Sequence, residues 1–329
     1  MKAIVLDEYG GPEVLRPREV PEPVPGPDEV LVRVVATALN RADLLQRMGR
    51  YPPPSPHSAH EIPGLEFAGT VERAGERVTA ARPGDRVCGL LASGGYAEYV
   101  VTHERMLIPI PEGMTFEEAA AIPEVFLTAF DALFSQANLR MGEVVLVHAG
   151  GSGVGTAAIQ LAHAAAARVL CTVGSAEKAT RAQALGAELA INYREQDWAA
   201  VTREATGGRG ADVILDFVGG PYLEQNVAAA APLGRIVFIG TMGGAAGTLN
   251  IGLIMQKRLR LFGTVLRARP IEEKIALTQA FIRQALPLFH AGLLHPVVDR
   301  VFALHEAPEA HRYMEDNRNF GKIVLRVTG

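Results

Sequence analysis

The chain has 329 residues and a mass of 35.1 kDa, a length that predicts about two domains. Hydrophobic residues make up 48% and charged residues 21%, as is typical of a globular protein with a buried core. The formal net charge is −4, with 32 Lys and Arg against 36 Asp and Glu, so there is no basic field for nucleic acid and no polybasic membrane patch.

The N-terminal part of the chain predicts short strands. Its first residues lack the apolar region of a signal peptide, and no stretch is apolar enough for a membrane span, so we expect a cytoplasmic protein. Up to about residue 120, strand-like stretches at 30–35, 67–71 and 86–90 alternate with turns rich in Pro and Gly. This pattern indicates a barrel-like all-β unit. The Pro52-Pro53-Pro54 run predicts a stiff loop.

The pattern changes near residue 142 to alternating strands and helices. Helical segments are expected at 154–167 and 177–185, with Gly186 ending the second of them. The strands between and after these helices are largely apolar, at 143–148, 169–173, 189–192, 213–217 and 235–239. Apolar strands alternating with helices predict a parallel sheet covered on both faces, which is a doubly wound nucleotide-binding domain.

The last part of the chain predicts a sixth strand at 260–265, a helix at 271–290, and strands at 297–300 and 323–327. Because this tail resembles the head of the chain, we expect it to complete the first domain. The predicted segments are 1–123 for the first part of that domain, 124–267 for the inserted cofactor domain and 268–329 for the completion. Apolar residues in the sixth strand, Leu261, Phe262 and Val265, predict an edge that pairs with a second copy.

A glycine-rich loop lies between the strand at 143–148 and the helix that follows it. Gly150 and Gly155 match the first and third glycines of the dinucleotide pattern G-x-G-x-x-G, and Ser152 stands at the second. Gly150 would make the tight turn, Gly155 would let the helix pack on the strand, and the first helical amides would face a pyrophosphate. The alternative is a turn needed only for packing, which the strand-to-helix context disfavours.

The next strand indicates which dinucleotide is bound. NAD enzymes usually place Asp or Glu at the end of this strand to hold the ribose hydroxyls, but here Gly174 and Ser175 follow Val173. Lys178 lies one turn further, where its ammonium could meet a 2′-phosphate. Glu177 could instead turn towards a ribose, and Lys178 could be a solvated helix lysine. We predict NADPH.

Six stretches together carry a family resemblance: ALNRADL at 38–44, GRYPPP at 49–54, AAIPE at 120–124, HAGGSGVGTAAIQ at 148–160, TMGG at 241–244 and NFGKIVL at 319–325. Over essentially its whole length, the chain resembles the zinc-free quinone oxidoreductase and zeta-crystallin branch of the medium-chain dehydrogenase/reductase superfamily. Within that branch it looks most like the tumour-suppressor-inducible quinone oxidoreductases and their bacterial relatives. The resemblance implies an α/β fold, with a GroES-like β-rich catalytic domain and a doubly wound Rossmann domain that binds NADPH.

The resemblance also implies a set of cofactor-binding residues. Ser175, Lys178 and Tyr193 would surround the 2′-phosphate, although Tyr193 could merely pack at a strand end. Asn319 would line the nicotinamide side, although it could merely form a turn before Gly321. The predicted cofactor residues are Thr128 from the first helix of the cofactor domain; Ser152, Gly153, Val154 and Gly155 at the pyrophosphate; Gly174, Ser175, Lys178 and Tyr193 near the 2′-phosphate; and Gly240, Met242, Val265, Leu266 and Asn319 at the nicotinamide.

Zinc is not expected. Zinc alcohol dehydrogenases of the superfamily have Cys where Asn40 stands, His where Leu65 stands and a further Cys near Thr128. Asn40 and Leu65 cannot replace these ligands, and two cysteines, Cys88 and Cys171, are too few for a four-cysteine site. A local cluster of His57, His60, Glu61 and Glu66 is interpreted as loop polarity rather than as a metal site.

Without a Lewis acid, the acceptor must take a hydride unaided, which favours quinones and activated enones. The resemblance places Asn40 and Tyr51 beside the interdomain cleft, where an amide and a phenol could steady the developing oxyanion. Alternatively, Asn40 satisfies local backbone and Tyr51 packs against prolines. The predicted function is an NADPH-dependent quinone oxidoreductase, assembled as a homodimer or homotetramer like its relatives. An NADPH-dependent 2-alkenal or enoyl reductase, or a non-catalytic crystallin-like or RNA-binding protein, is the alternative.

Overall fold

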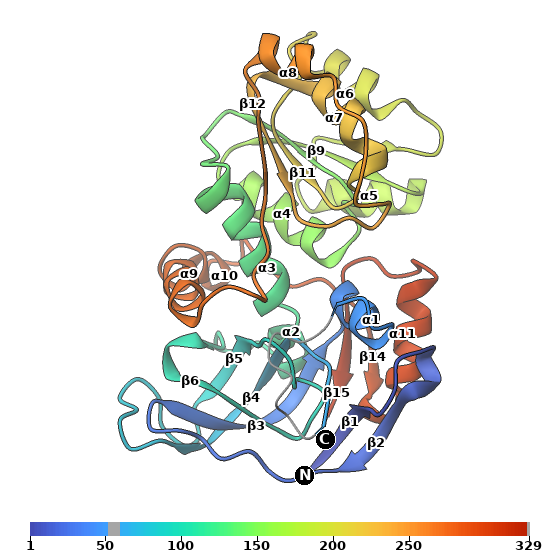
Figure 1. The fold of residues 1–329 in the computed structure, drawn as a ribbon. Helices are drawn as coiled ribbons and strands as arrows, with labels where there is room; N and C mark the ends of the chain where they lie inside the picture. Colours follow the sequence, from blue (N-terminus) through green and yellow to red (C-terminus); the bar gives the residue numbers. More distant parts are fainter. Residues whose placement is uncertain (52–59, 328–329) are drawn as a thin grey trace. The chain divides into compact units, whose positions relative to one another are not determined.

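The computed structural model describes residues 1–51 and 60–327, and the chain divides into two compact units. Unit 1 comprises Met1–Leu127 and Leu266–Gly329, and unit 2 comprises Thr128–Val265. The blue N-terminal and red C-terminal segments in Figure 1 both belong to unit 1, so unit 2 is inserted into it. The boundaries differ by a few residues from those expected after 123 and 267. Helix α3 (Pro123–Phe130) runs across the first boundary, which is why a change of sequence pattern does not locate it.

The described part of unit 1 is built on a seven-stranded sheet, in which six strands follow the order β14-β15-β3-β4-β5-β7 and the seventh, β6, pairs with β3. Its central strand, β3 (Glu29–Ala38), pairs along one edge with β4 and along the other with β6 and then β15, all antiparallel. The C-terminal strand therefore completes a sheet begun at the N-terminus. The other strands of unit 1 are β1 (Lys2–Leu6) and β2 (Leu15–Glu19), which form a separate pair, and β4 (Glu66–Ala74), β5 (Arg86–Leu90), β6 (Tyr99–His103), β7 (Leu107–Pro109), β14 (Val298–Ala303) and β15 (Lys322–Arg326).

Short helices join these strands. Helices α1 and α2 were not predicted from the sequence, because five to seven residues are too few to show a helical period. The single helix expected at 271–290 is two helices, and Pro287 lies in the first turn of the second, where its missing N–H breaks no helical hydrogen bond. The unit 1 helices are α1 (Arg41–Arg47), α2 (Phe116–Ala120), α9 (Ile271–Gln284), α10 (Leu286–His290) and α11 (Ala307–Glu315), besides α3.

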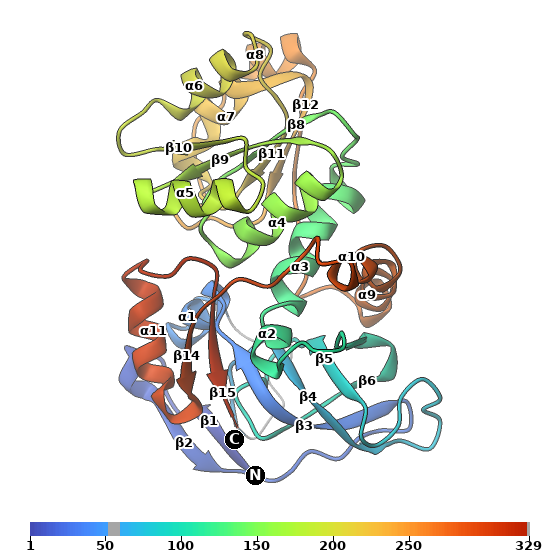
Figure 2. The ribbon, with the colours of Figure 1, turned by 180° about the vertical axis from the view of Figure 1, so that it is seen from behind.

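Unit 2 is a six-stranded parallel sheet with the order β10-β9-β8-β11-β12-β13. Helices α4 and α5 cover one face, and α6, α7 and α8 cover the other (Figures 1 and 2), which confirms the predicted doubly wound fold. The strands are β8 (Val144–Val147), β9 (Arg168–Val173), β10 (Leu189–Asn192), β11 (Ala211–Asp216), β12 (Ala230–Phe238) and β13 (Arg260–Gly263). The helices are α4 (Gly153–Ala164), α5 (Ala176–Ala184), α6 (Trp198–Ala205), α7 (Leu223–Ala229) and α8 (Ile251–Lys257), with a π-helix at Asp131–Gln136.

The two central strands of unit 2 explain where a ligand can bind. Every residue of β8 and β11 is buried, as expected for a sheet covered on both faces. The chain leaves β8 for β9 on one side, and returns to β11 on the other, so the strand order reverses between β8 and β11. Ligands of open α/β sheets bind at the carboxyl ends of the strands beside such a reversal.

Within the described residues, every helix is too short or too polar to cross a bilayer.

Candidate active site

The glycine-rich loop lies at the carboxyl end of β8. The Gly150 amide donates to the carbonyl of Thr172 on β9 at 2.8 Å, and Ser152 caps α4 by accepting from the Gly155 amide at 3.0 Å. A Cβ on Gly155 would lie 2.3 Å from the Ala149 carbonyl oxygen, so the helix can approach the loop this closely only through glycine. The first amides of the helix have no intrahelical acceptor, and helix starts of this kind can bind anions.

A buried polar network lies next to this loop, at the carboxyl ends of β8 and β11. His148, fully buried at the end of β8, contacts Thr172 Oγ1 through Nδ1 at 3.1 Å and Asn226 Oδ1 through Nε2 at 2.7 Å. The Asn226 amide nitrogen donates to the Asp216 carboxylate at 2.8 Å, which leaves its oxygen to accept from His148. The imidazole is therefore protonated on Nε2 and accepts on Nδ1. Burial lowers the pKa of His148 to about 4, so the ring is neutral at pH 7.

The residues predicted around the 2′-phosphate come together at the carboxyl ends of β9 and β10. Ser175 caps α5, and its hydroxyl accepts from the Lys178 amide at 3.3 Å. A Cβ on Gly174 would lie 2.9 Å from the Tyr193 hydroxyl, and the Tyr193 amide donates to the Val173 carbonyl at 3.1 Å. Because β9 pairs with β8, this group adjoins the glycine loop on the same edge of the sheet.

The remaining predicted residues of unit 2 lie mostly on this edge as well. Gly240 and Met242 follow β12, and their amides donate to carbonyls of Asp216 and Phe217 at the end of β11. Val265 follows β13 and is 54% exposed, whereas Thr128 is buried within α3. Leu266, predicted for the cofactor domain, belongs to unit 1 instead, because the chain crosses between the units just before it.

In unit 1, Asn40 belongs to a buried ion cluster. Its side-chain oxygen accepts from Lys322 Nζ at 2.6 Å, and its amide nitrogen donates to Glu66 Oε1 at 2.8 Å and Ala38 O at 3.4 Å. Lys322 and Glu66 form an ion pair at 2.7 Å, with side chains 3% and 0% exposed. Every polar atom of the Asn40 side chain therefore has a protein partner, and the shorter of these contacts are made to distant side chains rather than to local backbone.

This ion cluster, Asn40, Glu66 and Lys322, also ties several elements together. Lys322 donates to the Leu39 carbonyl at 2.6 Å, and Glu66 Oε2 accepts from the Glu124 amide at 2.9 Å. The cluster thus joins the end of β3, the starts of β4, α1 and β15, and the start of α3. The interpretation of Glu66 as loop polarity is wrong, because it is the first residue of β4 and its charge is neutralised by Lys322. A charged residue within an apolar strand pattern was the signal that could have indicated this.

The donor set at Asn40 does not fit a metal ion. Leu65 offers no ligand atom, and Asn40 Oδ1 faces an ammonium group that would repel a dication. In the described part of the chain, no group of three or more His, Cys, Asp or Glu side chains is arranged to hold a metal. Of the local cluster considered from the sequence, His57 lies outside the described residues, as does the Pro52-Pro53-Pro54 run.

Tyr51 is paired with Arg267, which was not among the residues predicted from the sequence. The guanidinium of Arg267 lies 4.8 Å from the centre of the Tyr51 ring, and it donates to the Tyr51 carbonyl at 3.0 Å. Arg267 is itself fixed by Gln46 Oε1 at 2.6 Å and the Ala92 carbonyl at 2.7 Å. Burial raises the pKa of Tyr51, so its phenol is a neutral hydrogen-bond donor at pH 7. Arg267 directly follows the predicted site residue Leu266, but its partners are distant in sequence.

Asn319 lies in the turn that leads into β15. Its amide nitrogen donates to the Gly321 carbonyl at 2.8 Å, and Gly321 has a φ of +92°. This geometry fits the alternative of a turn former. Its role at a nicotinamide stays a prediction.

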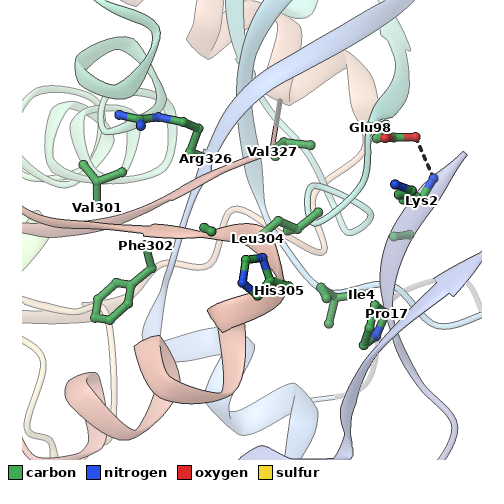
Figure 3. A pocket seen from close by; sticks show the side chains of 12 residues that line it. Lys2, Ile4, Pro17, Glu98, Val301, Phe302, Leu304, His305, Arg326 and Val327 are labelled. Atoms are coloured by element: carbon green, nitrogen blue, oxygen red, sulfur yellow. Dashed lines mark hydrogen bonds between the residues drawn. The ribbon is translucent and has the colours of Figure 1, made fainter. Parts of the chain in front are cut away.

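A cavity of about 690 Å³ in unit 1 lies apart from all these residues (Figure 3). Ile4 and Pro17 line one side of it, and Phe302 and Leu304 line another. Of its charged residues, Glu98 accepts from the Lys2 amide at 2.7 Å and Arg326 donates to Glu117 at 2.8 Å. None of the predicted site residues lines this cavity, so it is not the candidate active site.

A parallel sheet with a glycine loop, inserted into a β-rich unit, defines the class of medium-chain dehydrogenases and reductases. Two family models match the chain accordingly. The model for the "Alcohol dehydrogenase GroES-like domain" matches residues 26–112, and the model for "Zinc-binding dehydrogenase" matches residues 153–281. The second description names zinc binding, but the donor set at Asn40 does not fit a zinc ion.

The chain belongs to the quinone oxidoreductase family of this superfamily. The quinone oxidoreductase of Pseudomonas aeruginosa is 36% identical to it over 98% of this chain and 99% of its own length. The chain is therefore an NAD(P)-dependent oxidoreductase of the quinone or enoyl reductase type, and the predicted GroES-like and Rossmann units are confirmed.

Solved structures agree on the fold and differ in the cofactor that they name. A structure described as an NAD-dependent alcohol dehydrogenase is 38% identical, with a TM-score of 0.90 and complete coverage of both chains, 100% each. A mycobacterial protein solved in complex with NADPH is 31% identical, with a TM-score of 0.88 over 99% of this chain and 100% of its own. A nicotinamide cofactor is common to both.

Proposed function

We propose that this protein is an NADPH-dependent quinone oxidoreductase that transfers a hydride directly to a quinone without a metal ion. The observation that carries the proposal is the arrangement at the carboxyl edge of the unit 2 sheet. A glycine loop adjoins Ser175, Lys178 and Tyr193, and no carboxylate stands at the ribose position at the end of β9. When bound, NADPH supplies the hydride from its nicotinamide ring.

The phosphate-binding residues have distinct tasks in this proposal. The amides of Gly153 and Val154, with the Ser152 hydroxyl, bind the pyrophosphate at the start of α4. Ser175 accepts from the Lys178 amide, which leaves the Ser175 O–H free to donate to a 2′-phosphate. The Lys178 ammonium and the Tyr193 hydroxyl complete this phosphate site.

The competing interpretation gave Glu177 a role at a ribose. The Glu177 side chain is 81% exposed and lies 3.9 Å from Arg181 on the same helix, so it is directed into solvent. This position favours the NADPH interpretation over NADH. The nicotinamide would be lined by Gly240, Met242, Val265, Leu266 and Asn319, with Thr128, as the family resemblance implies.

On the acceptor side, we propose that Tyr51 donates a hydrogen bond to the quinone oxygen as charge develops on it. Within the described residues, its hydroxyl has no hydrogen-bond partner, and its raised pKa keeps the proton on it. Asn40 has both amide hydrogens engaged, so we assign it to holding the β3–α1 corner in place. Quinones and activated enones need no Lewis acid, because their oxyanion is conjugated.

The test is steady-state kinetics with NADPH and NADH against an ortho-quinone, a para-quinone and an enone. We expect a quinone to be the best acceptor and NADPH to be preferred. Lys178→Ala should lower kcat/KM for NADPH by roughly tenfold or more and leave NADH unchanged, since about 1.4 kcal/mol of charge-assisted bonding is lost. Lys2→Ala, an exposed lysine in unit 1, is the control.

Three outcomes would contradict this proposal in different ways. If Lys178→Ala keeps the preference for NADPH, the 2′-phosphate site is wrong. If enones turn over faster than quinones at matched cofactor concentration, the protein is an alkenal or enoyl reductase. If no acceptor is reduced and RNA binds in a manner reversed by NADPH, the non-catalytic alternative holds.

We also propose that the protein assembles through β13. This strand is last in the sheet order and pairs only with β12, so its outer edge is open within unit 2. Leu261 and Phe262 are half-buried there, and an open apolar edge favours pairing with a second copy. Sedimentation should give at least twice the chain mass of 35.1 kDa, and a monomer alone would contradict the proposal. A cytoplasmic location stays a prediction.

A further inference from the structure

The amino edge of the unit 2 sheet gathers arginines. Because all six strands are parallel, the starts of β8, β11, β12 and β13 lie at the edge opposite the glycine loop. A cavity of about 350 Å³ opens there, which we call the arginine pocket. Its charged lining consists of Arg140, Arg209, Arg235, Arg258 and Arg260, together with Glu143 and Asp212.

We propose that the arginine pocket is a second ligand site, which binds a small organic anion that carries a di- or polyphosphate group. Five guanidinium groups face two carboxylates, which leaves a net charge of +3 on the lining. Neither the dinucleotide site nor the acceptor chemistry involves these residues.

The two carboxylates are already neutralised within the pocket. Arg235 holds both oxygens of Glu143, at 2.9 and 2.6 Å, and Arg209 holds both oxygens of Asp212, at 2.8 and 2.5 Å. Each carboxylate also accepts from a backbone amide at 2.8 Å. The acids therefore have little capacity left for further cations.

The other three arginines are unpaired in the part of the chain that the structure describes. Arg140, Arg258 and Arg260 are exposed, and within the described residues their guanidinium groups make no hydrogen bond or ion pair. Arg260 on β13 stands directly beside Arg235 on β12 in the sheet register. Like charges on neighbouring strand positions destabilise a sheet, and a bound anion would relieve this repulsion.

The shape and lining of the pocket define the class of ligand. The planar fork of arginine binds phosphate oxygens in pairs, so several forks around one cavity favour a phosphate group over a monocarboxylate. The lining also contains the apolar residues Pro232, Leu233 and Phe262, which would contact an organic portion of the ligand. Leu233 is 54% exposed and has a φ of +65°, a conformation that costs energy for a non-glycine residue and is frequent at binding sites.

The experiment uses the enzyme saturated with NADPH, so that the dinucleotide site cannot bind the probe. Inorganic pyrophosphate, ADP and adenosine are titrated separately by calorimetry at low and high salt. We expect pyrophosphate and ADP to bind at one site per chain, with ADP binding more tightly, and adenosine not to bind. Affinity should fall with increasing salt, because the contacts are ionic.

The test variant is a double variant that combines Arg258→Gln and Arg260→Gln. The matched control is Arg203→Gln, which changes an exposed arginine on α6. The double variant should weaken pyrophosphate binding at least tenfold, and the control should not change it. Arg140→Gln gives the same test on a different segment if the double variant fails to fold or alters the sedimentation behaviour.

The proposal is overturned if pyrophosphate gives no heat with the NADPH-saturated enzyme, or if the arginine variants bind it as the parent does. Binding of an RNA oligonucleotide without binding of pyrophosphate or ADP would overturn it too. If NADPH itself does not bind, pyrophosphate binding by the parent and the arginine variants is compared without NADPH. The arginine-pocket proposal and the proposed NADPH-dependent function can therefore fail separately.

Discussion

The two units use their buried polar groups in opposite ways. In unit 1, the side chains of Asn40, Glu66 and Lys322 satisfy one another and leave no donor for a ligand. In unit 2, the network under the glycine loop is also satisfied, but the amides at the start of α4 have no intrahelical acceptor. Saturated side chains hold a fold in place, whereas unpaired backbone donors bind ligands.

The largest expected effect is on unit 1. Lys322→Met removes the ammonium and leaves Glu66 buried without a counter-charge, so the free energy of unfolding should fall by about 3–5 kcal/mol in urea denaturation. NADPH affinity of the folded variant should stay within about twofold, because the proposed phosphate-binding residues belong to unit 2, which has its own core, and residues that share no partners usually act independently. Lys322→Arg, which keeps the charge, should recover part of the stability. A loss below about 1 kcal/mol would show that the ion cluster is not the brace we describe.

The buried imidazole of unit 2 should make stability depend on pH. The pKa of His148 is lowered from 6.5 to about 4, so between these values the unfolded chain binds a proton that the folded chain does not. Stability therefore falls as pH drops through this window, by about 3 kcal/mol at pH 4 from this group. His148→Gln should flatten the curve of unfolding free energy between pH 6.5 and 4. Parallel curves for parent and variant would contradict the assignment.

Two buried groups of unit 1 also titrate, so the comparison must be made against the parent protein. The pKa of His311 is lowered to about 3 by burial, which acts in the same direction as His148. The pKa of Asp43 is raised to about 6, chiefly by burial, so its contribution to stability is lost as pH rises from about 4 to about 6. These contributions are common to parent and variant, and they cancel in the difference.

A substitution in the glycine loop should weaken NADPH binding strongly while the protein still folds. Gly155→Ala places a Cβ 2.3 Å from the Ala149 carbonyl oxygen, so the start of α4 must move away from the loop. NADPH affinity should fall about 100-fold, or about 2.7 kcal/mol, in a fluorescence titration. Gly252→Ala in α8, where the nearest atom is 3.4 Å away, is the control and should bind normally. Unchanged affinity in Gly155→Ala would remove the loop from the site.

The smallest expected effect separates the two unit 1 residues predicted to be catalytic. Tyr51→Phe should lower kcat for quinone about tenfold, or about 1.4 kcal/mol, without changing stability, because the hydroxyl that is lost has no hydrogen-bond partner among the described residues. Asn40→Ala should instead lower stability, because it breaks the ion cluster. If folded Asn40→Ala loses more kcat than Tyr51→Phe, the catalytic role first predicted for Asn40 stands.

The sequence by itself determined the architecture of unit 2 and was enough to propose cofactor residues at its carboxyl edge. Apolar strands, helical periods and glycine spacing are local signals, because each reflects residues a few positions apart. One short segment likewise shows that no acidic residue directly follows Val173 and that Lys178 lies nearby, which are the two observations that favour NADPH. The return of the C-terminal tail to strand character was enough to indicate that unit 1 is completed by it.

Only the tertiary structure decided which polar residues are free to act. Lys322 and Glu66 are 256 positions apart, and His148 and Asn226 are 78 apart, so no local pattern announces either pair. Asn40 is held by Glu66 and Lys322, and five arginines from separate segments line one pocket, because the fold brings distant segments together. Whether a buried donor is satisfied depends on an acceptor about 3 Å away in space. When that acceptor is far away in sequence, no short segment of the sequence reveals it.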